Sequence, residues 1–205
     1  MIIAVYKPKG PSSFRIIGQI RRVTGVKKVG HAGTLDPLAS GILVVGIGRE
    51  GTKKLAEAVG QDKEYVAEIE LGAESATDDA EGPIIRGSFT KIPKSKIVPV
   101  VKKFIGEIDQ VPPIYSAIKV GGRRAYKLAR AGKSPQMKAR KALIKDIKIL
   151  AYSWPILKIK VITGPGVYIR ALARDIGQEL GVGAYMKELE RTRVGEFTKK
   201  DALFL

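Results

Sequence analysis

The stretch that most constrains the fold is GHAGTLDPLASGILVVGIG, which runs from Gly30 to Gly48. Its five glycines and one proline require tight turns and close backbone approaches. The apolar run Ile42–Ile47 within it predicts a covered strand. The loop before this run holds a single carboxylate, Asp36, at the mouth of the strand. An aspartate before a proline is often only a turn residue, so this stretch alone predicts either a rigidly aimed acid or a plain turn.

Hydrophobic periodicity predicts strands and amphipathic helices that form one α+β domain over residues 1–205. The predicted strands are residues 2–6, 42–47, 65–71, 142–151 and 156–162. The predicted helices are a segment from Ser12 or Ser13 to Gly25, residues 52–59, 95–105 and 167–180, and a short basic helix after the hairpin turn GGRR. The last twenty residues predict a short element followed by an apolar tail.

The same periodicity assigns individual side chains to the core. Val23 and Ile105 fall on the inward faces of their helices. Tyr65 begins the inward face of its strand, and Glu68 and Glu70 lie on the opposite face. A tyrosine in that position usually only packs, unless its ring or hydroxyl lines a pocket.

The charge is large and unevenly distributed along the chain. The 37 Lys and Arg against 20 Asp and Glu give a net charge of +17. Residues 1–35 carry seven basic residues and residues 119–145 carry ten, with no acid in either segment, whereas residues 62–81 hold eight acids and one base. A generally basic surface explains the total, but the segregation favours a nucleic-acid-binding face. The basic block 119–145 is then either a solvated flap or a segment that binds an anion.

The composition excludes several kinds of site. The chain has no cysteine and one histidine, His31, which rules out disulfides, thiolate zinc sites and His-rich metal sites. The segment around Asp78, Asp79 and Glu81 does not have the spacing of a calcium loop, so it predicts a solvated turn and no metal site. The N-terminal apolar stretch is too short for a signal peptide, and no run approaches the roughly 20 residues that span a bilayer. We therefore expect a cytoplasmic protein that does not bind a membrane.

A cation is predicted where a helix begins. Tyr168 and Arg170 fall in the first turn of the helix that follows the bend TGPG. A cation at a helix N-terminus opposes the helix dipole, so we expect Arg170 to have a carboxylate or phosphate partner.

Six segments together resemble one known family. GHAGTLDPLASGIL is similar to the signature of the bacterial-type TruB family of tRNA pseudouridine synthases, and KPKGPSSF, KEYVAEIELG, TDDAEG, QVPPIYSAIKVGGRRAYKLARAG and GVYIRALARDIG resemble that family's other blocks in the same order. The resemblance covers nearly the whole chain. It implies the pseudouridine synthase fold, a central mixed, largely antiparallel sheet flanked by helices and loops, with a catalytic cleft. Members of that family commonly carry a C-terminal RNA-binding PUA-type domain or a shorter extension, and as a departure from this pattern we expect a short form without the PUA-type domain.

The resemblance also implies a reaction and its catalytic residues. The reaction is the cofactor-free isomerisation of uridine 55 in the T-loop of tRNA to pseudouridine. Asp36 matches the family's nucleophile, which attacks either ribose C1′ or base C6. Tyr65 matches the tyrosine that stacks on the target base and is a candidate for assisting removal of the C5 proton. Arg170 matches the arginine that pairs with the aspartate.

Other positions are expected to bind the substrate. The basic block resembles the family's RNA-clasping insertion. The substrate-binding positions that we assign are His31, Tyr168, Leu189, Lys7, Lys119, Arg123 and Arg124. The expected partner is the T-arm stem-loop of tRNA, bound by a monomer, and DNA is not expected as a partner.

Two other classes of function remain open on the sequence. A non-catalytic RNA-binding protein or tRNA-folding chaperone would use the same basic surface, and a structural ribosome-associated protein is a weaker alternative. Asp36, Tyr65 and Arg170 favour the enzyme, because a chaperone has no need of an aspartate that repels phosphate.

Overall fold

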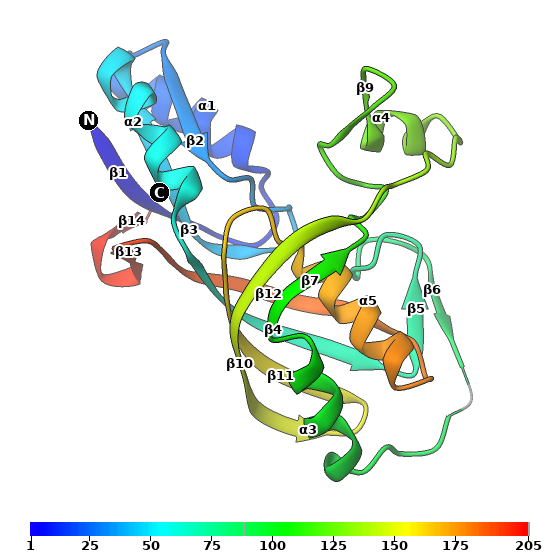
Figure 1. The fold of residues 1–205 in the computed structure, drawn as a ribbon. Coiled ribbons are helices and arrows are strands. Elements are labelled where there is room, and N and C mark those ends of the chain that lie inside the picture. Colours follow the sequence, from blue (N-terminus) through cyan, green and yellow to red (C-terminus); the bar gives the residue numbers. More distant parts are fainter. Residues whose placement is uncertain (88, 205) are drawn as a thin grey trace. The chain divides into compact units, whose positions relative to one another are not determined.

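The computed structural model describes residues 1–87 and 89–204. Figure 1 shows the chain as a ribbon with its elements labelled. The strands are β1 (Ile2–Lys7), β2 (Val29–Ala32), β3 (Ser40–Ile47), β4 (Lys63–Leu71), β5 (Ala73–Ser75), β6 (Ile84–Arg86), β7 (Gly106–Gln110), β8 (Lys119–Val120), β9 (Arg123–Arg124), β10 (Arg140–Ser153), β11 (Ile156–Thr163), β12 (Ala184–Val194), β13 (Phe197–Thr198) and β14 (Ala202–Phe204). The helices are α1 (Ser13–Thr24), α2 (Gly48–Gly60), α3 (Lys94–Lys103), α4 (Ala125–Arg130) and α5 (Ile169–Glu179), with a 3-10 turn at Lys199–Asp201.

The chain divides into two compact units, which we describe separately. The first unit contains Met1–Val66, Lys160–Pro165 and the C-terminal segment from Glu188, and the second contains Ala67–Ile159 and Gly166–Lys187. Strands β4, β11 and β12 each have residues in both units. The expectation that residues 1–205 form a single domain stays a prediction.

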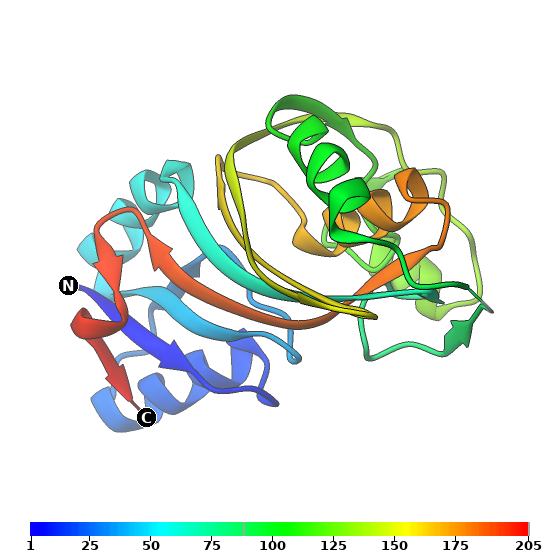
Figure 2. The same ribbon diagram turned by 90° about the horizontal axis from the view of Figure 1, so that it is seen from below.

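The first unit is a sheet with a helix on each face. Figure 2 shows α1 in blue and α2 in cyan on opposite sides of β1 and β3. Alternate residues of β3 point to the two helices: Leu43 and Val45 pack with α1, and Ile42 and Val44 pack with α2. Both faces of β3 are therefore buried, which explains why this strand is apolar at consecutive positions.

Strand pairing in the first unit is mixed. Strands β14, β1, β3 and β12 lie in that order. The β1–β3 and β2–β3 pairs are antiparallel, and β1–β14 and β3–β12 are parallel. Gly46 of β3 is pressed against α2, since a Cβ atom there would lie 2.4 Å from the Gly51 carbonyl oxygen. The prediction of an α+β fold with a mixed sheet is confirmed.

The second unit combines antiparallel strands with two long helices. Strand β10 pairs antiparallel with β7, and the short strands β5 and β6 form a hairpin. Helix α3 contacts β10 and α5. The residues buried in this unit include Ile97 of α3, Ile144 of β10, and Leu172 and Ile176 of α5. Among the described residues, no helix is long and apolar enough to cross a membrane.

The basic block is a hairpin and a short helix followed by a strand. Strands β8 and β9 are joined by the two glycines Gly121 and Gly122, both with positive φ, as the sequence predicts for a hairpin turn. Helix α4 follows directly, and residues 140–145 already belong to β10. We call residues 119–139 the basic segment. All seven of its lysines and arginines are exposed.

Several core assignments were wrong at the ends of elements. Val23 is 81% exposed, because it lies in the last turn of α1, which ends at Thr24, where no other segment packs over it. Ile105 is 40% exposed, since α3 ends at Lys103. Glu70 is buried instead of outward, and it accepts a hydrogen bond from Tyr185 and pairs with Lys187.

The prediction for the C-terminal segment was also wrong. Residues 184–194 form the long strand β12, and β13 and β14 add two more strands. Polar side chains interrupt the apolar pattern of β12, because residues 187–193 are all charged or polar except Leu189 and do not alternate regularly with buried positions. That interruption hides the strand from a periodicity argument.

Candidate active site

Asp36 lies in a loop whose backbone is bonded on both sides of it. We call residues 33–39, between β2 and β3, the Asp36 loop. The Ser13 hydroxyl, 2% exposed, donates to the Leu35 carbonyl oxygen at 2.8 Å and accepts from the Leu35 amide at 2.9 Å. Asp36 itself accepts through its carbonyl oxygen from the Ala39 amide at 3.1 Å. One serine therefore satisfies both backbone groups of the residue before Asp36.

The residue after Asp36 is held as firmly. The Pro37 carbonyl oxygen accepts from the Gly10 amide at 2.8 Å and from the Lys7 ammonium at 3.4 Å. The Lys7 ammonium also donates to the carbonyl oxygens of Pro8 and Pro11, at 2.9 and 2.8 Å. The Lys7 side chain is fully buried, so in this structure it anchors the loop from inside. Its assignment to RNA binding stays a prediction.

Three other predicted residues belong to the same unit. Tyr65, on β4, is 7% exposed, and Leu189, on β12, is partly buried. His31, on β2, is partly buried too, and its pKa lies below the ordinary value because burial and the nearby Arg191 guanidinium disfavour the imidazolium. The neutral imidazole is therefore favoured at this position.

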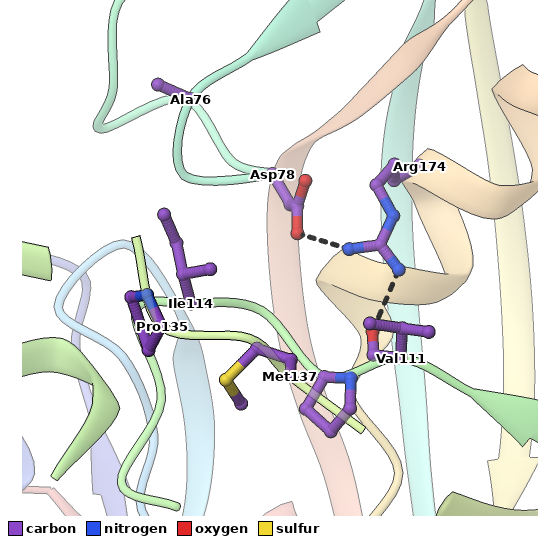
Figure 3. A pocket seen from close by; sticks show the side chains of 8 residues that line it. Ala76, Asp78, Val111, Ile114, Pro135, Met137 and Arg174 are labelled. Atoms are coloured by element: carbon purple, nitrogen blue, oxygen red, sulfur yellow. Dashed lines mark hydrogen bonds and ion pairs between the residues drawn. The ribbon is translucent and has the colours of Figure 1, made fainter. Parts of the chain in front are cut away.

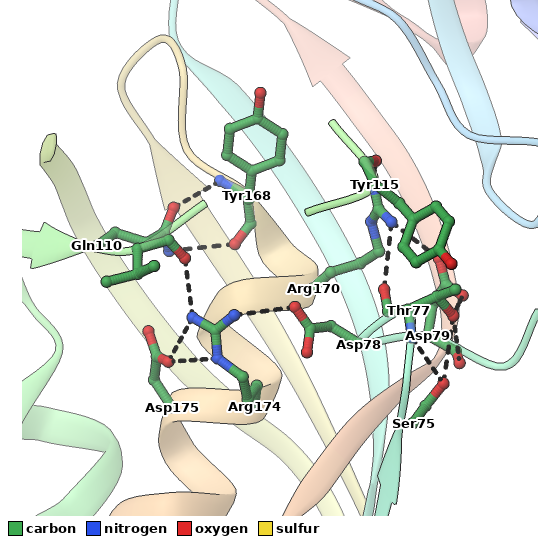
Figure 4. A network of polar contacts seen from close by, with 11 residues as sticks. Ser75, Thr77, Asp78, Asp79, Gln110, Tyr115, Tyr168, Arg170, Arg174 and Asp175 are labelled. Carbon is green, nitrogen blue, oxygen red and sulfur yellow. Dashed lines mark hydrogen bonds and ion pairs between the residues drawn. The ribbon is translucent and has the colours of Figure 1, made fainter. Parts of the chain in front are cut away.

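Arg170 lies in the second unit, at the start of α5. It is 6% exposed, and its guanidinium pairs with Asp79 at 3.3 Å. It also donates to the carbonyl oxygens of Thr77 and Tyr115, at 3.2 and 3.0 Å, as Figure 4 shows. The expectation that this cation needs a carboxylate partner is confirmed, with Asp79 as that partner.

The prediction of a solvated acidic turn was wrong for Asp79, whereas Asp78 is partly buried and Glu81 is exposed. Asp79 is 1% exposed and accepts hydrogen bonds from the Thr77 hydroxyl and the Glu81 amide. The aspartate is buried because the turn folds over the start of α5, where Arg170 compensates its charge. Among the described residues, no group of three or more His, Cys, Asp or Glu side chains is placed to hold a metal ion.

A second ion pair lies one helical turn further along α5. The Arg174 guanidinium bonds Asp78 at 2.9 Å, Asp175 at 2.8 Å and the Val111 carbonyl oxygen at 2.8 Å. Burial raises the pKa of the Asp78 carboxyl, against the opposing charges of Arg174 and Arg170. Figure 3 shows that this pair forms one wall of a pocket of about 310 Å³. Its other walls are mostly apolar: Ala76, Val111, Pro112, Ile114, Pro135 and Met137.

Tyr168 is fixed by a side-chain amide. Gln110, at the end of β7, donates to the Tyr168 carbonyl oxygen at 3.1 Å and accepts from the Tyr168 amide at 2.9 Å (Figure 4). Tyr168 is the residue that precedes α5. The glutamine therefore holds the backbone from which Arg170 projects two residues later.

The basic segment offers a site for an anion. A pocket of about 440 Å³ is lined by glycine, alanine and leucine together with four cations, Arg123, Arg124, Lys127 and Lys133. Lys119, at the base of the hairpin, is exposed as well. Exposed cations at this density favour phosphate groups as ligands.

The predicted catalytic residues and three of the predicted substrate-binding residues are divided between the two units. Asp36, Tyr65, His31 and Leu189 belong to the first unit, and Arg170 and Tyr168 belong to the second. The pairing of Arg170 with Asp36 stays a prediction. Sequence reasoning missed Asp79 as the partner of Arg170 and Ser13 as the anchor of Leu35, because each contact joins residues more than twenty positions apart.

Comparison with known sequences identifies the protein family that the chain matches. Residues 21–169 match the family described as "TruB family pseudouridylate synthase (N terminal domain)", and residues 170–205 match "tRNA pseudouridylate synthase B C-terminal domain". A protein of Mycobacterium sp. (strain KMS) named tRNA pseudouridine synthase B is 47% identical over 98% of this chain and 69% of its own length. A protein of the same name from Clostridium novyi (strain NT) is 46% identical over 100% of this chain and 70% of its own.

Solved structures agree with this match. A chain of the structure titled "Crystal Structure of a Cbf5-Nop10-Gar1 Complex" is 32% identical with a TM-score of 0.77. A chain of "Structure of H/ACA RNP bound to a substrate RNA containing 2'-deoxyuridine" is 30% identical with a TM-score of 0.73. The present chain is covered over 100% and 99% of its length, and it spans about half of each of those chains, 52% and 50%.

Proposed function

Because the chain belongs to the TruB family of pseudouridylate synthases, we propose that it isomerises uridine 55 in the T-loop of tRNA to pseudouridine. The reaction breaks the N1–C1′ bond of the nucleotide and forms a C5–C1′ bond. A proton leaves C5 and a proton is taken up at N1, so the atoms of the nucleotide are conserved. The reaction is redox-neutral and needs no electron carrier.

The observation that supports the proposal most is the bonding of the Asp36 loop. A nucleophilic carboxylate must be held in one direction while the substrate approaches, because a small displacement of the reacting atom lowers the rate steeply. The backbone groups of Leu35 and the carbonyl oxygens of Asp36 and Pro37 are all hydrogen-bonded. A plain surface turn does not need anchors on both sides. Asp36 is therefore assigned as the nucleophile, attacking either ribose C1′ or base C6.

The other catalytic assignments follow from what the nucleotide must do. A uridine in a folded loop has to leave its stack before its glycosidic bond can be reached, and an aromatic ring replaces the lost stacking. Tyr65 is assigned to stack on the base. Arg170 is assigned to favour the ionised form of Asp36, since a guanidinium near a carboxylate stabilises its charge. Its bonds to Asp79 and to two carbonyl oxygens hold the guanidinium in one orientation.

The substrate is assigned from charge and exposure. The basic segment presents Lys119, Arg123 and Arg124 to solvent, where they are placed to contact phosphates of the T-arm stem-loop. His31, Tyr168 and Leu189 are assigned to the surroundings of the extruded nucleotide. We propose that the chain binds its RNA as a monomer.

Tritium release tests this function directly. A T-arm hairpin carrying 5-tritiated uridine only at position 55 is expected to release its label to water on incubation with the protein, because C5 loses its proton in the isomerisation. A hairpin labelled only at a stem uridine is the matched control and should release none. RNA binding without release, from either the hairpin or whole tRNA, would contradict the enzymatic proposal and support the non-catalytic alternative.

A further inference from the structure

Arg191 lies on β12 beside the start of β3, and the two backbones touch there. Arg191 is 2% exposed, and β12 runs parallel to β3 with Arg191 opposite Gly41. Gly41 has a φ of 113°, and a Cβ atom there would lie 2.2 Å from the Arg191 carbonyl oxygen. Only glycine permits this approach, so the position of Arg191 relative to β3 is fixed by the backbone.

The Arg191 side chain bonds the first residue of the Asp36 loop and the strand that follows the loop. Its Nε donates to the Ile42 carbonyl oxygen at 2.8 Å, and its Nη2 donates to the Gly33 carbonyl oxygen at 3.0 Å. Gly33 directly follows β2, and Ile42 is the third residue of β3. One planar guanidinium therefore joins the segment that enters the loop to the strand that leaves it.

Two other basic side chains belong to the surroundings of Gly33 and Arg191. The Cε atom of Lys63 lies 3.9 Å from the place of a Cβ on Gly33, and His31 lies two residues before Gly33. The pKa values of His31 and Lys63 are both lowered, first by burial and second by the charge of Arg191. The charge of the Arg191 guanidinium therefore lowers the pKa of two basic side chains near the start of the loop.

We propose that Arg191 is a positioning residue for the isomerisation, whose guanidinium holds the start of the Asp36 loop to β3 and thereby fixes the direction of the Asp36 carboxylate. This role rests on the proposed function, because it assigns Arg191 to the same reaction. Arg191 acts through the loop and is not assigned a contact with the substrate. A lysine cannot replace it, because an ammonium lacks the rigid fork that bonds two carbonyl oxygens at once.

Three variants test this role. Arg191→Lys keeps the charge and loses the paired hydrogen bonds to the Gly33 and Ile42 carbonyl oxygens. Arg191→Met loses both the charge and the hydrogen bonds. Arg193→Met is the matched control: it removes an arginine two residues along the same strand, whose Nη1 bonds the Gly195 carbonyl oxygen in the following turn. Circular dichroism and the thermal midpoint identify the variants that remain folded.

The first measurement is the single-turnover rate of tritium release with enzyme in saturating excess. In Arg191→Lys the rate should fall by about 10²-fold, the order expected for a misplaced reacting group. The dissociation constant for the RNA should stay within about threefold, since no phosphate contact is removed. Arg193→Met should keep the wild-type rate. A folded Arg191→Lys variant with the wild-type rate would overturn the proposal.

The second measurement does not depend on turnover. Amide hydrogen exchange at Leu35 and Ala39 should speed up in Arg191→Lys, because a loosened loop weakens the bond of the Leu35 amide to the Ser13 hydroxyl and that of the Ala39 amide to the Asp36 carbonyl oxygen. His31 is the only histidine, so its imidazole gives one NMR titration: the pKa should rise in Arg191→Met and stay low in Arg191→Lys. If the wild-type protein releases no tritium, the proposed function fails while the exchange test still reports on the loop. Unchanged exchange in both variants would overturn the positioning role.

Discussion

The Asp36 loop and the basic segment differ in how they are bonded. The Asp36 loop is seven residues long, and buried Ser13 and Lys7 hold the backbone on either side of the aspartate. The basic segment is three times as long and exposes all its cations, and its helix α4 buries only Ala125. This difference fits two tasks. A reacting carboxylate must be fixed, whereas cations that follow an RNA backbone have to adapt to it.

Replacing Asp36 by asparagine should have the largest effect. Asparagine keeps the size of the side chain and cannot attack carbon as a carboxylate does, so tritium release should fall by at least about 10³-fold. RNA affinity should stay within about threefold, because the binding surface is unchanged. The matched control is Asp109→Asn, which alters an exposed aspartate that pairs with Lys141. Turnover of Asp36→Asn near the wild-type rate would remove Asp36 from its role.

Two neighbouring serines separate loop anchoring from helix capping. Ser13→Ala leaves both backbone groups of Leu35 without their partner, which should cost about 2 kcal/mol of unfolding free energy and lower kcat about tenfold or more. Ser12→Ala removes the N-cap of α1, which should cost about 1 kcal/mol and leave kcat unchanged. Urea denaturation and single-turnover kinetics measure the two effects. Equal kcat values in the two variants would show that the anchor at Leu35 does not matter for the reaction.

Charge removal in the basic segment should change binding and its salt dependence. In the double variant Arg123→Ala/Arg124→Ala, the slope of log affinity against log salt should become shallower by about 1 to 2 units. Affinity at about 0.1 M salt should fall roughly tenfold. The double variant Lys96→Ala/Lys102→Ala removes the same charge from exposed positions of α3 and should leave both quantities nearly unchanged. If the slope of log affinity against log salt became equally shallow in both double variants, the net charge of the protein, and not the basic segment, would determine RNA binding.

The smallest effect concerns pH. The pKa of His31 is lowered in the folded protein, so between that pKa and about 6.5 the unfolded chain binds more protons than the folded one. The free energy of unfolding should therefore decrease as the pH falls below about 6.5, by less than about 1.4 kcal/mol per pH unit. Urea denaturation between pH 5.5 and 7.5 measures the slope, and His31→Gln should flatten it. A wild-type curve as flat as that of His31→Gln would contradict a lowered pKa.

Local patterns in the sequence were enough to predict most elements of the fold. The consecutive apolar residues of β3, the alternation in β4 and β11, and the Ser12 cap and Gly25 stop of α1 are all signals carried by neighbouring residues. They were confirmed because each element buries the face that its pattern predicts. Predictions at the ends of elements were less accurate. Val23 and Ile105 fit the inward positions of their helical patterns, but no other segment covers them and both are exposed.

Long-range polar pairs could not be predicted in this way. Asp79, Glu70 and Arg191 are charged residues that lie buried, and each is buried because of a partner far along the chain. The sequence alone does not distinguish a buried carboxylate from a solvated one, because Asp and Glu are expected to be exposed wherever no partner is known. A partner for Arg170 was predictable because a cation at a helix start needs one. The role of Asp36 stays a prediction, because turn residues before a covered strand fit a plain turn as well as an aimed acid.

One measurement tests the division between a fixed loop and an adaptable binding segment most directly. Tritium release from the T-arm hairpin is followed in single turnover, at enzyme concentrations raised until the rate no longer increases, for Ser13→Ala and for Arg123→Ala/Arg124→Ala. We expect the arginine variant to reach the wild-type rate at saturation and the serine variant to remain slow, because one loses binding and the other loses the position of Asp36. If the serine variant recovered the wild-type rate at saturation, or the arginine variant did not, the two regions would not have the separate tasks that their bonding indicates.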